Sequence, residues 1–173
     1  MATSVSLPAA ELYRDLLAHL SAVEDEQVAF LFTHPPVDGE ALQVRELYAV
    51  PEDGFLDQSP YYLALSDEVR ARVLGRATEL GGCLVETHSH AFGPAGFSPT
   101  DLSGFEEWVP HVRWRLGGRP YVALVFAGES FDALVWEGDG GPAPLAQLDV
   151  PGVGALAPTG ITFDRLASGR DGR

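Results

Sequence analysis

Short apolar runs alternate with longer amphipathic runs along this chain, and their order constrains the fold more strongly than any other feature. Residues 27–32, QVAFLF, and 120–128, PYVALVFAG, are short and rich in residues typical of buried strands. Residues 8–23 instead repeat leucine at the spacing of one face of a helix. From one end to the other, the runs follow the order α-β-β-α-β-α-β-β. This order predicts an α/β fold in which a single mixed β-sheet is flanked by helices.

The same patterns give the expected bounds of each element. We predict helices at residues 8–23, 66–80 and 98–112, the last of them interrupted near Pro110. We predict strands at residues 27–32, 41–50, 81–90, 120–128 and 131–138, with a further edge strand at 145–150. The first two strands, and the fourth and fifth, are expected to form hairpins. We predict an irregular loop at 51–65, between the second strand and the second helix. Its aromatic residues are candidates for substrate binding: Phe55, Tyr61 and Tyr62.

The length of the chain indicates a single domain. A chain of 173 residues can bury one full core but is too short for two. We predict that residues 1–140 form the principal domain. Residues 141–173 are rich in glycine and proline, and we expect an extension that packs on the same domain and ends loosely at 169–173.

The net charge of −14, from 25 acidic and 11 basic residues, limits the partners that the surface can bind. A surface of this sign repels phosphate backbones and anionic lipids, which argues against binding to nucleic acid or to a membrane. The N-terminal residues lack the basic and apolar regions of a secretory signal. The single cysteine, Cys83, cannot form an internal disulfide. These two features predict a cytoplasmic protein.

Residues 86–101, ETHSHAFGPAGFSPTD, contain the strongest indication of a functional site. Alternate side chains of a strand point to the same face, so His88 and His90 can both reach one metal ion. A catalytic zinc site usually has three protein ligands and leaves the fourth position to water. The natural third ligand is Asp101, which the intervening loop carries back to the start of the next helix. The sequence therefore predicts a metal site formed by these three residues.

The same residues also have a simpler interpretation. Ser98, Pro99 and Asp101 fit a helix start, with serine at the N-cap, proline in the first turn and an acid three residues after the cap. A His-x-His pair on a strand can equally belong to the surface or to the core. The cap and the metal site are compatible, because a helix start also fixes the aspartate in place.

The spacing of these residues resembles that of a known enzyme family. The pattern looks like the signature of the JAMM, or MPN-plus, zinc metalloproteases. It consists of His88-Ser89-His90, a gap of seven residues, Ser98, a gap of two residues, and Asp101. Glu26, just before an apolar run, is similar to a glutamate that precedes a short strand in that family. The chain resembles the prokaryotic branch that occurs with ubiquitin-like proteins and E1-like activating enzymes. One departure is Ala91, where many members have proline, but it removes no ligand.

The resemblance implies a fold, a cofactor and a role for each residue. The fold would be the MPN, or cytidine-deaminase-like, α-β-α arrangement, with residues 1–140 as the catalytic domain. One Zn²⁺ would be bound by His88, His90 and Asp101. Glu26 would be the general base, and Ser98 would hydrogen-bond the oxyanion or the zinc-bound water.

The implied reaction is hydrolysis of the peptide or isopeptide bond after the C-terminal tail of a ubiquitin-like protein, with E1-like or E2-like enzymes as possible partners. Zinc lowers the pKa of its bound water to about 7. A carboxylate that is not itself a ligand can then accept the proton and deliver it to the leaving amine. The residues alone leave open which of the adjacent acids Glu24, Asp25 and Glu26 faces the site. Only the resemblance favours Glu26.

Two other functions remain open at this stage. The first keeps the chemistry and changes the substrate, for example to the processing of a sulfur-carrier protein. The second is a non-catalytic MPN scaffold that only binds partner proteins. The intact ligand and base positions argue against the scaffold.

Overall fold

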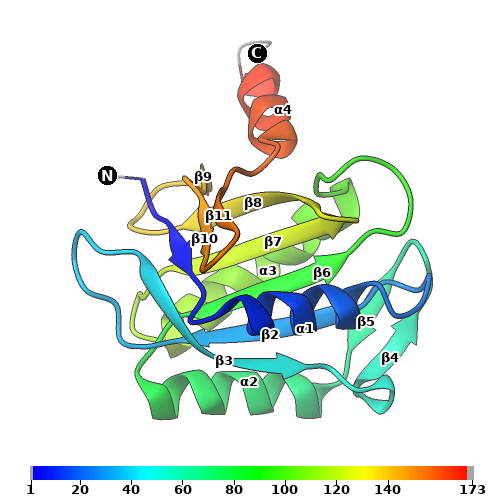
Figure 1. Cartoon of the computed structure of the whole chain (residues 1–173), viewed down its shortest axis with the longest axis horizontal. Helices are drawn as coiled ribbons and strands as arrows, with labels where there is room; N and C mark the ends of the chain where they lie inside the picture. Colours follow the sequence, from blue (N-terminus) through cyan, green and yellow to red (C-terminus); the bar gives the residue numbers. More distant parts are fainter. Residues whose placement is uncertain (1, 171–173) are drawn as a thin grey trace.

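The computed structural model describes residues 2–170 and is built around one large β-sheet (Figure 1). The strands are β1 (Val5–Ser6), β2 (Val28–Thr33), β3 (Leu42–Ala49), β4 (Phe55–Gln58), β5 (Leu63–Leu65), β6 (Leu84–Ser89), β7 (Tyr121–Ala127), β8 (Ser130–Trp136), β9 (Ala143–Pro144), β10 (Leu148–Val150) and β11 (Gly154–Leu156). The helices are α1 (Ala10–Leu20), α2 (Asp67–Leu80), α3 (Pro99–Arg115) and α4 (Ile161–Arg170), with a short 3-10 turn at Glu52–Gly54.

The large sheet is mixed, as the order of the sequence patterns predicts. Within residues 2–170 it has nine strands in the order β11-β10-β1-β3-β2-β6-β7-β8-β9. β6 runs parallel to β7, and β1 runs parallel to both β3 and β10. The two predicted hairpins are confirmed as the antiparallel pairs β2–β3 and β7–β8. The predicted fold class, a single mixed sheet flanked by helices, is therefore confirmed.

Side chains of the central strands alternate between two apolar layers. On β2, Leu31 packs in the layer that also contains Leu16 and Leu20 of α1. The neighbouring Phe30 points the other way, into the layer formed with α2 and α3. Because strands of this kind are buried on both faces, they appear in the sequence as continuous apolar runs rather than as alternating ones. His88 of β6 lies on the α2 and α3 side, since it has the same parity as the buried Leu84.

Helix α2 begins and ends at the residues that the sequence indicates. The Ser66 side chain accepts a hydrogen bond from the Val69 backbone N–H at 3.3 Å, as an N-cap does. The helix ends at Gly81, whose φ of 65° lies in the left-handed region that favours glycine.

The predicted interruption of α3 at Pro110 is wrong, because the helix continues to Arg115. Proline removes one backbone hydrogen bond inside a helix. Pro110 lies on the exposed face, where water can satisfy the carbonyl that loses its partner. The opposite face is held in the core by Phe105, Val109 and Val112. Burial of these side chains outweighs the effect of the proline.

Residues 51–65 are more regular than predicted. They contain the 3-10 turn and the antiparallel pair β4–β5, which forms a separate two-stranded sheet. Pairing is irregular between Phe55 and Asp57, where the register shifts. A strand pair this short, with a bulge, has no repeating pattern that sequence reasoning can detect.

The C-terminal segment is part of the same sheet and adds an unpredicted helix. The predicted strand at 145–150 is present as β10, one position in from the edge, because β11 pairs with its outer side. Helix α4 extends outward at the top of Figure 1. Of the loose end expected at 169–173, residues 169 and 170 belong to α4, and residues 171–173 lie outside the described part of the chain.

Gly82 makes the closest backbone approach among the described glycines. A Cβ at this position would lie 1.8 Å from the Thr33 carbonyl oxygen, a backbone atom that cannot move aside without disrupting β2. We expect Gly82→Ala to lower the free energy of unfolding by about 3 kcal/mol or more, the upper range for overpacking. Chemical denaturation would measure the change.

The matched control is Gly75→Ala in α2. Nothing lies within 4 Å of a Cβ at Gly75, so this substitution is expected to raise stability by about 0.5–1 kcal/mol, as alanine does over glycine inside a helix. Equal stability of the two variants would contradict the close approach at Gly82.

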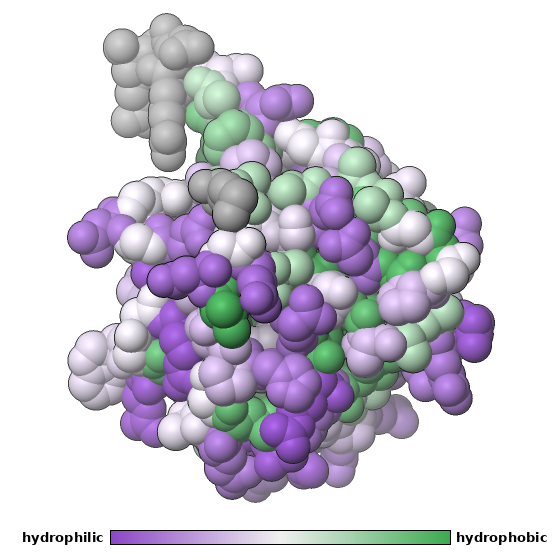
Figure 2. All heavy atoms as spheres, turned by 60° about the vertical axis from the view of Figure 1, so that its left-hand side comes forward, coloured by the Kyte–Doolittle hydropathy of each residue, from purple (hydrophilic) through white to green (hydrophobic). Residues whose placement is uncertain are grey.

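None of the helices within residues 2–170 is long and apolar enough to cross a membrane. Figure 2 shows polar and apolar residues interspersed over the face that it presents.

Candidate metal centre

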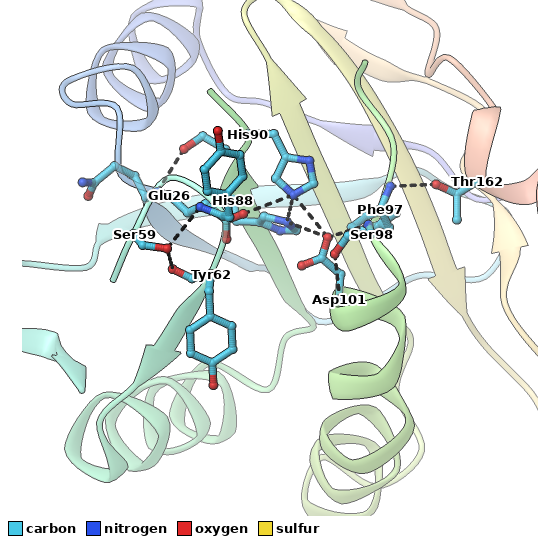
Figure 3. Close-up of polar contacts among 12 residues, drawn as sticks. Glu26, Ser59, Tyr62, His88, His90, Phe97, Ser98, Asp101 and Thr162 are labelled. Carbon is cyan, nitrogen blue, oxygen red and sulfur yellow. Dashed lines mark hydrogen bonds and ion pairs between the residues drawn. The ribbon is translucent and has the colours of Figure 1, made fainter. Parts of the chain in front are cut away.

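His88, His90 and Asp101 converge on one point at the end of β6 (Figure 3). His88 is on β6, and His90 follows it, where its backbone N–H still bonds to the Phe126 carbonyl of β7 at 2.8 Å. Asp101 comes from the first turn of α3. The strand fixes the two imidazoles on one face, and the helix start carries the carboxylate back to them. The structure thus brings together all three predicted ligands.

The distances within this cluster are those expected of ligands around one small ion. The Nε2 atoms of His88 and His90 are 3.2 Å apart, and Oδ2 of Asp101 is 3.4 Å from the first and 3.2 Å from the second. A tetrahedral zinc site with bonds of about 2.0–2.1 Å places neighbouring ligand atoms about 3.3 Å apart. Two imidazoles and a carboxylate are also a ligand set that zinc commonly has. The residues present therefore fit a zinc ion.

Asp101 is both a helix cap and a potential ligand. Its Oδ2 accepts the Ser98 backbone N–H at 2.8 Å, while the Ser98 hydroxyl oxygen accepts the Asp101 N–H at 3.1 Å. This reciprocal pair is a capping box, so the simpler interpretation of the sequence is also correct. The same Oδ2 faces both imidazoles, because the cap fixes the carboxylate's orientation. Within residues 2–170 the Ser98 hydroxyl accepts a hydrogen bond but donates none, so its proton can bond a ligand.

The charges in the cluster reinforce one another. Burial alone would raise the pKa of Asp101, but hydrogen bonds from His88 and His90 hold it well below its usual range. Burial opposes the charged form of His88, yet the hydrogen bond and charge of Asp101 raise its pKa overall. The ionised Asp101 carboxylate therefore stabilises positive charge at the two buried imidazoles.

Glu26 is the acid that lies beside the cluster. Glu26 is 4 % exposed, and its Oε1 lies 3.5 Å from Nε2 of His90. Burial raises its pKa, an effect that the neighbouring His88 and His90 partly offset. By contrast Glu24 is exposed and Asp25 half-buried. Of the three adjacent acids, the geometry selects Glu26.

The loop between β4 and β5 holds Glu26 in place from the other side. The Glu26 backbone N–H donates to the Ser59 carbonyl at 2.8 Å, and the Gln58 side chain donates to the Glu26 carbonyl at 2.9 Å. Ser59 also accepts a hydrogen bond from the Tyr61 backbone N–H through its hydroxyl, at 3.2 Å. The segment with the candidate substrate-binding tyrosines is therefore tied to the candidate base.

Glu86 bonds to Tyr121, although its position on β6 suggests His88 as a partner. It shares a face with His88 but accepts a hydrogen bond from the Tyr121 hydroxyl, which in turn accepts one from Trp108 Nε1 at 3.0 Å. Burial raises the pKa of Glu86. Nδ1 of His88 is buried and has no hydrogen-bond partner within the described residues. The His88 ring is therefore oriented by the polar contacts of Nε2 and by packing on Phe97, with ring centres 5.7 Å apart.

A cleft of about 570 Å³ leads to the cluster between β5 and the first turns of α3. Two residues of the cluster, His88 and Asp101, line its wall together with Glu26. Two of the candidate substrate-binding residues, Tyr61 and Tyr62, line it as well. Phe55, the third candidate, does not line this cleft. It is half-buried and packs against the core on the α2 and α3 side. Tyr61 also stacks on Phe92, with ring centres 5.8 Å apart.

Comparison with known proteins gives the fold but no function. No family model matches the chain, and no curated protein matches it. The solution structure of a protein from Desulfitobacterium hafniense matches with a TM-score of 0.53 and 20% identity, over 84% of this chain and 93% of that chain. A solution structure from Salinibacter ruber matches with a TM-score of 0.49 and 23% identity, over 88% and 95% of the two chains. The first similarity supports the fold alone, and the second supports no conclusion.

Proposed function

We propose that this protein is a zinc-dependent hydrolase that cleaves the peptide or isopeptide bond after the C-terminal tail of a ubiquitin-like protein. The observation that carries the proposal is the convergence of His88, His90 and Asp101 beside the buried carboxylate of Glu26. Two imidazoles, one ligand carboxylate and one further carboxylate match the parts of the JAMM signature that the sequence resembles. The JAMM assignment itself is part of this proposal.

Each residue of the cluster then has a distinct task. The zinc, when bound, would supply an activated water and polarise the scissile carbonyl. Glu26 would accept the proton of the attacking water and deliver it to the leaving amine, as a positioned carboxylate can. Ser98, through its hydroxyl proton, would donate to the developing oxyanion. Asp101 would be kept ionised by its capping bonds and by the imidazoles.

The shape of the cleft supports an extended peptide as the substrate. β5 lines the cleft and, among the described strands, pairs with β4 alone, so its other edge is available to a third strand. A peptide that adds to this edge would gain backbone hydrogen bonds, with Tyr61 and Tyr62 over its side. A glycine-rich tail would suit an approach to the metal along β5, since glycine lets two backbones come closest.

We place this activity in the cytoplasm. Cys83 is buried and free, as expected of a protein that works in a reducing compartment. The proposal includes E1-like or E2-like enzymes as partners through their shared substrate.

The test is cleavage of a fusion in which a glycine-rich tail of a ubiquitin-like protein is joined by a peptide bond to a reporter protein. Cleavage after the last tail residue is expected from the zinc-loaded protein, with loss of activity after chelation and recovery when zinc is returned. Full zinc loading without cleavage of peptide-linked or lysine-linked fusions would contradict the proposal and favour the scaffold. Cleavage of a sulfur-carrier fusion alone would keep the chemistry and change the substrate.

A further inference from the structure

The start of α4 lies against the loop that connects His90 to Asp101, and three side chains hold the loop's backbone. Thr162 Oγ1 accepts the Phe97 N–H at 2.9 Å, and Arg165 donates to the Phe97 carbonyl at 2.7 Å. Thr159 Oγ1 donates to the Ala95 carbonyl at 2.7 Å. Both backbone groups of Phe97, the residue just before the α3 N-cap, are thus bonded to the C-terminal segment. Figure 3 shows the bond to Thr162.

A buried carboxylate on β8 fixes the start of α4 in turn. Asp132 is 1 % exposed and accepts the backbone N–H groups of Gly160 at 3.0 Å and Thr162 at 2.8 Å. It also accepts the N–H of Ala133, at 2.9 Å. Three donors to one buried carboxylate compensate for its removal from water. Thr162 is therefore held at its backbone by the sheet while its side chain holds the loop.

The two segments are in close contact. A Cβ on Gly96 would lie 3.1 Å from Nη2 of Arg165 and 3.2 Å from a methyl group of Ile161. A side chain at this position would require Arg165 and Ile161 to shift slightly.

Phe97 connects this contact to the metal ligands in two ways. Its ring, which is fully buried, packs on the His88 ring, and that ring has no hydrogen bond at Nδ1 to orient it. Its backbone leads directly into Ser98, whose capping box orients Asp101. A shift of Phe97 would therefore move two of the three ligands.

We propose that the first turn of α4 is a positioning element of the metal centre, with Thr162 as the positioning residue that fixes Phe97. This role rests on the proposed function and deepens it. It makes the C-terminal segment a component of the site, although no hydrogen bond or ion pair joins its described residues to the metal ligands. Outer contacts of this kind typically change metal affinity by about 10–100-fold when they are removed.

Thr162→Val and Thr162→Ser form the matched pair that tests the proposal in the full chain. Valine keeps the branched shape and the backbone N–H to Asp132 but removes the hydroxyl acceptor, whereas serine retains it. We expect Thr162→Val to bind Co²⁺, used as a spectroscopic substitute for zinc, about 10-fold more weakly in competition with a chelator. Its d–d absorption should also change, and Thr162→Ser should restore both. Amide exchange at Phe97 and Asp101, measured without metal, should accelerate in Thr162→Val alone.

Val150→Ala in β10 is the control for general loss of stability, since Val150 is buried away from this loop. Wild-type affinity and spectrum in Thr162→Val would overturn the positioning role, as would an equal loss of affinity in Val150→Ala. A wild-type protein that binds neither Co²⁺ nor zinc would instead overturn the proposed function, and this role with it.

Discussion

Replacement of Glu26 by glutamine is expected to lower the rate of substrate hydrolysis by about 10²–10⁴-fold, the usual contribution of a positioned general base. Glutamine keeps the shape of the side chain and cannot accept the proton. The backbone bonds to Ser59 and Gln58 hold this position independently of the side chain, so the fold should persist. Zinc content should also persist, because Glu26 is not one of the three convergent ligands. Turnover of the reporter fusion and elemental analysis would measure the two effects.

Glu24→Gln is the matched control, with the same change of charge on an exposed side chain two residues away. It should retain near-normal turnover. Loss of activity in Glu24→Gln with retention in Glu26→Gln would mean that the exposed acid is the base. Full activity in both variants would mean that neither of these glutamates is the base, and the JAMM resemblance would then fail at its catalytic step.

The central strands and the helices α1, α2 and α3 could be predicted because local sequence patterns indicate which of their residues are buried. β2 and β7 are nearly continuous apolar runs, since both faces of the sheet are covered. Helix α2 has both end signals within its own residues, Ser66 and Gly81. In each case the sequence near the element carries the information that determines it.

The missed features depend on contacts with distant residues. Helix α4 begins where Asp132, on β8, accepts its first N–H groups. The continuation of α3 past Pro110 depends on core contacts of its opposite face. The contact that starts α4 has no local signature. The buried residues of α3, Phe105, Val109 and Val112, do have helical spacing across Pro110, but the proline favoured an interruption in the prediction.

In the candidate site, too, the residues that local sequence predicts differ from those that depend on distant contacts. His88, His90 and Asp101 lie within one short stretch, and strand parity together with a helix start places them close together. The choice of Glu26 over its neighbours required the pairing of β2 with β6, in which Val28 lies opposite His88. The contacts of Thr162 could not be predicted, because they require the path of the whole C-terminal segment across the sheet.

Loss of a ligand should have the largest effect on zinc, and Asp101→Asn is the most informative way to remove one. Asp101→Ala would remove the capping box together with the ligand, so any loss of zinc could reflect a frayed helix. Asparagine retains a side-chain oxygen that can accept the Ser98 N–H, and it leaves the Asp101 N–H bonded to the Ser98 hydroxyl. It removes the negative charge that faces both imidazoles.

We therefore expect Asp101→Asn to fold with near-normal thermal stability and to bind zinc more than about 100-fold more weakly, beyond the range for outer contacts. His88→Ala should give the same loss without altering the cap, because His88 takes no part in the capping box. Elemental analysis after dialysis and competition with a chelator would measure both variants. Full zinc retention in Asp101→Asn would leave Asp101 as a helix cap only. Full zinc retention in both Asp101→Asn and His88→Ala would mean that any bound zinc lies elsewhere. The two substitutions remove different ligands, which have only the zinc ion in common.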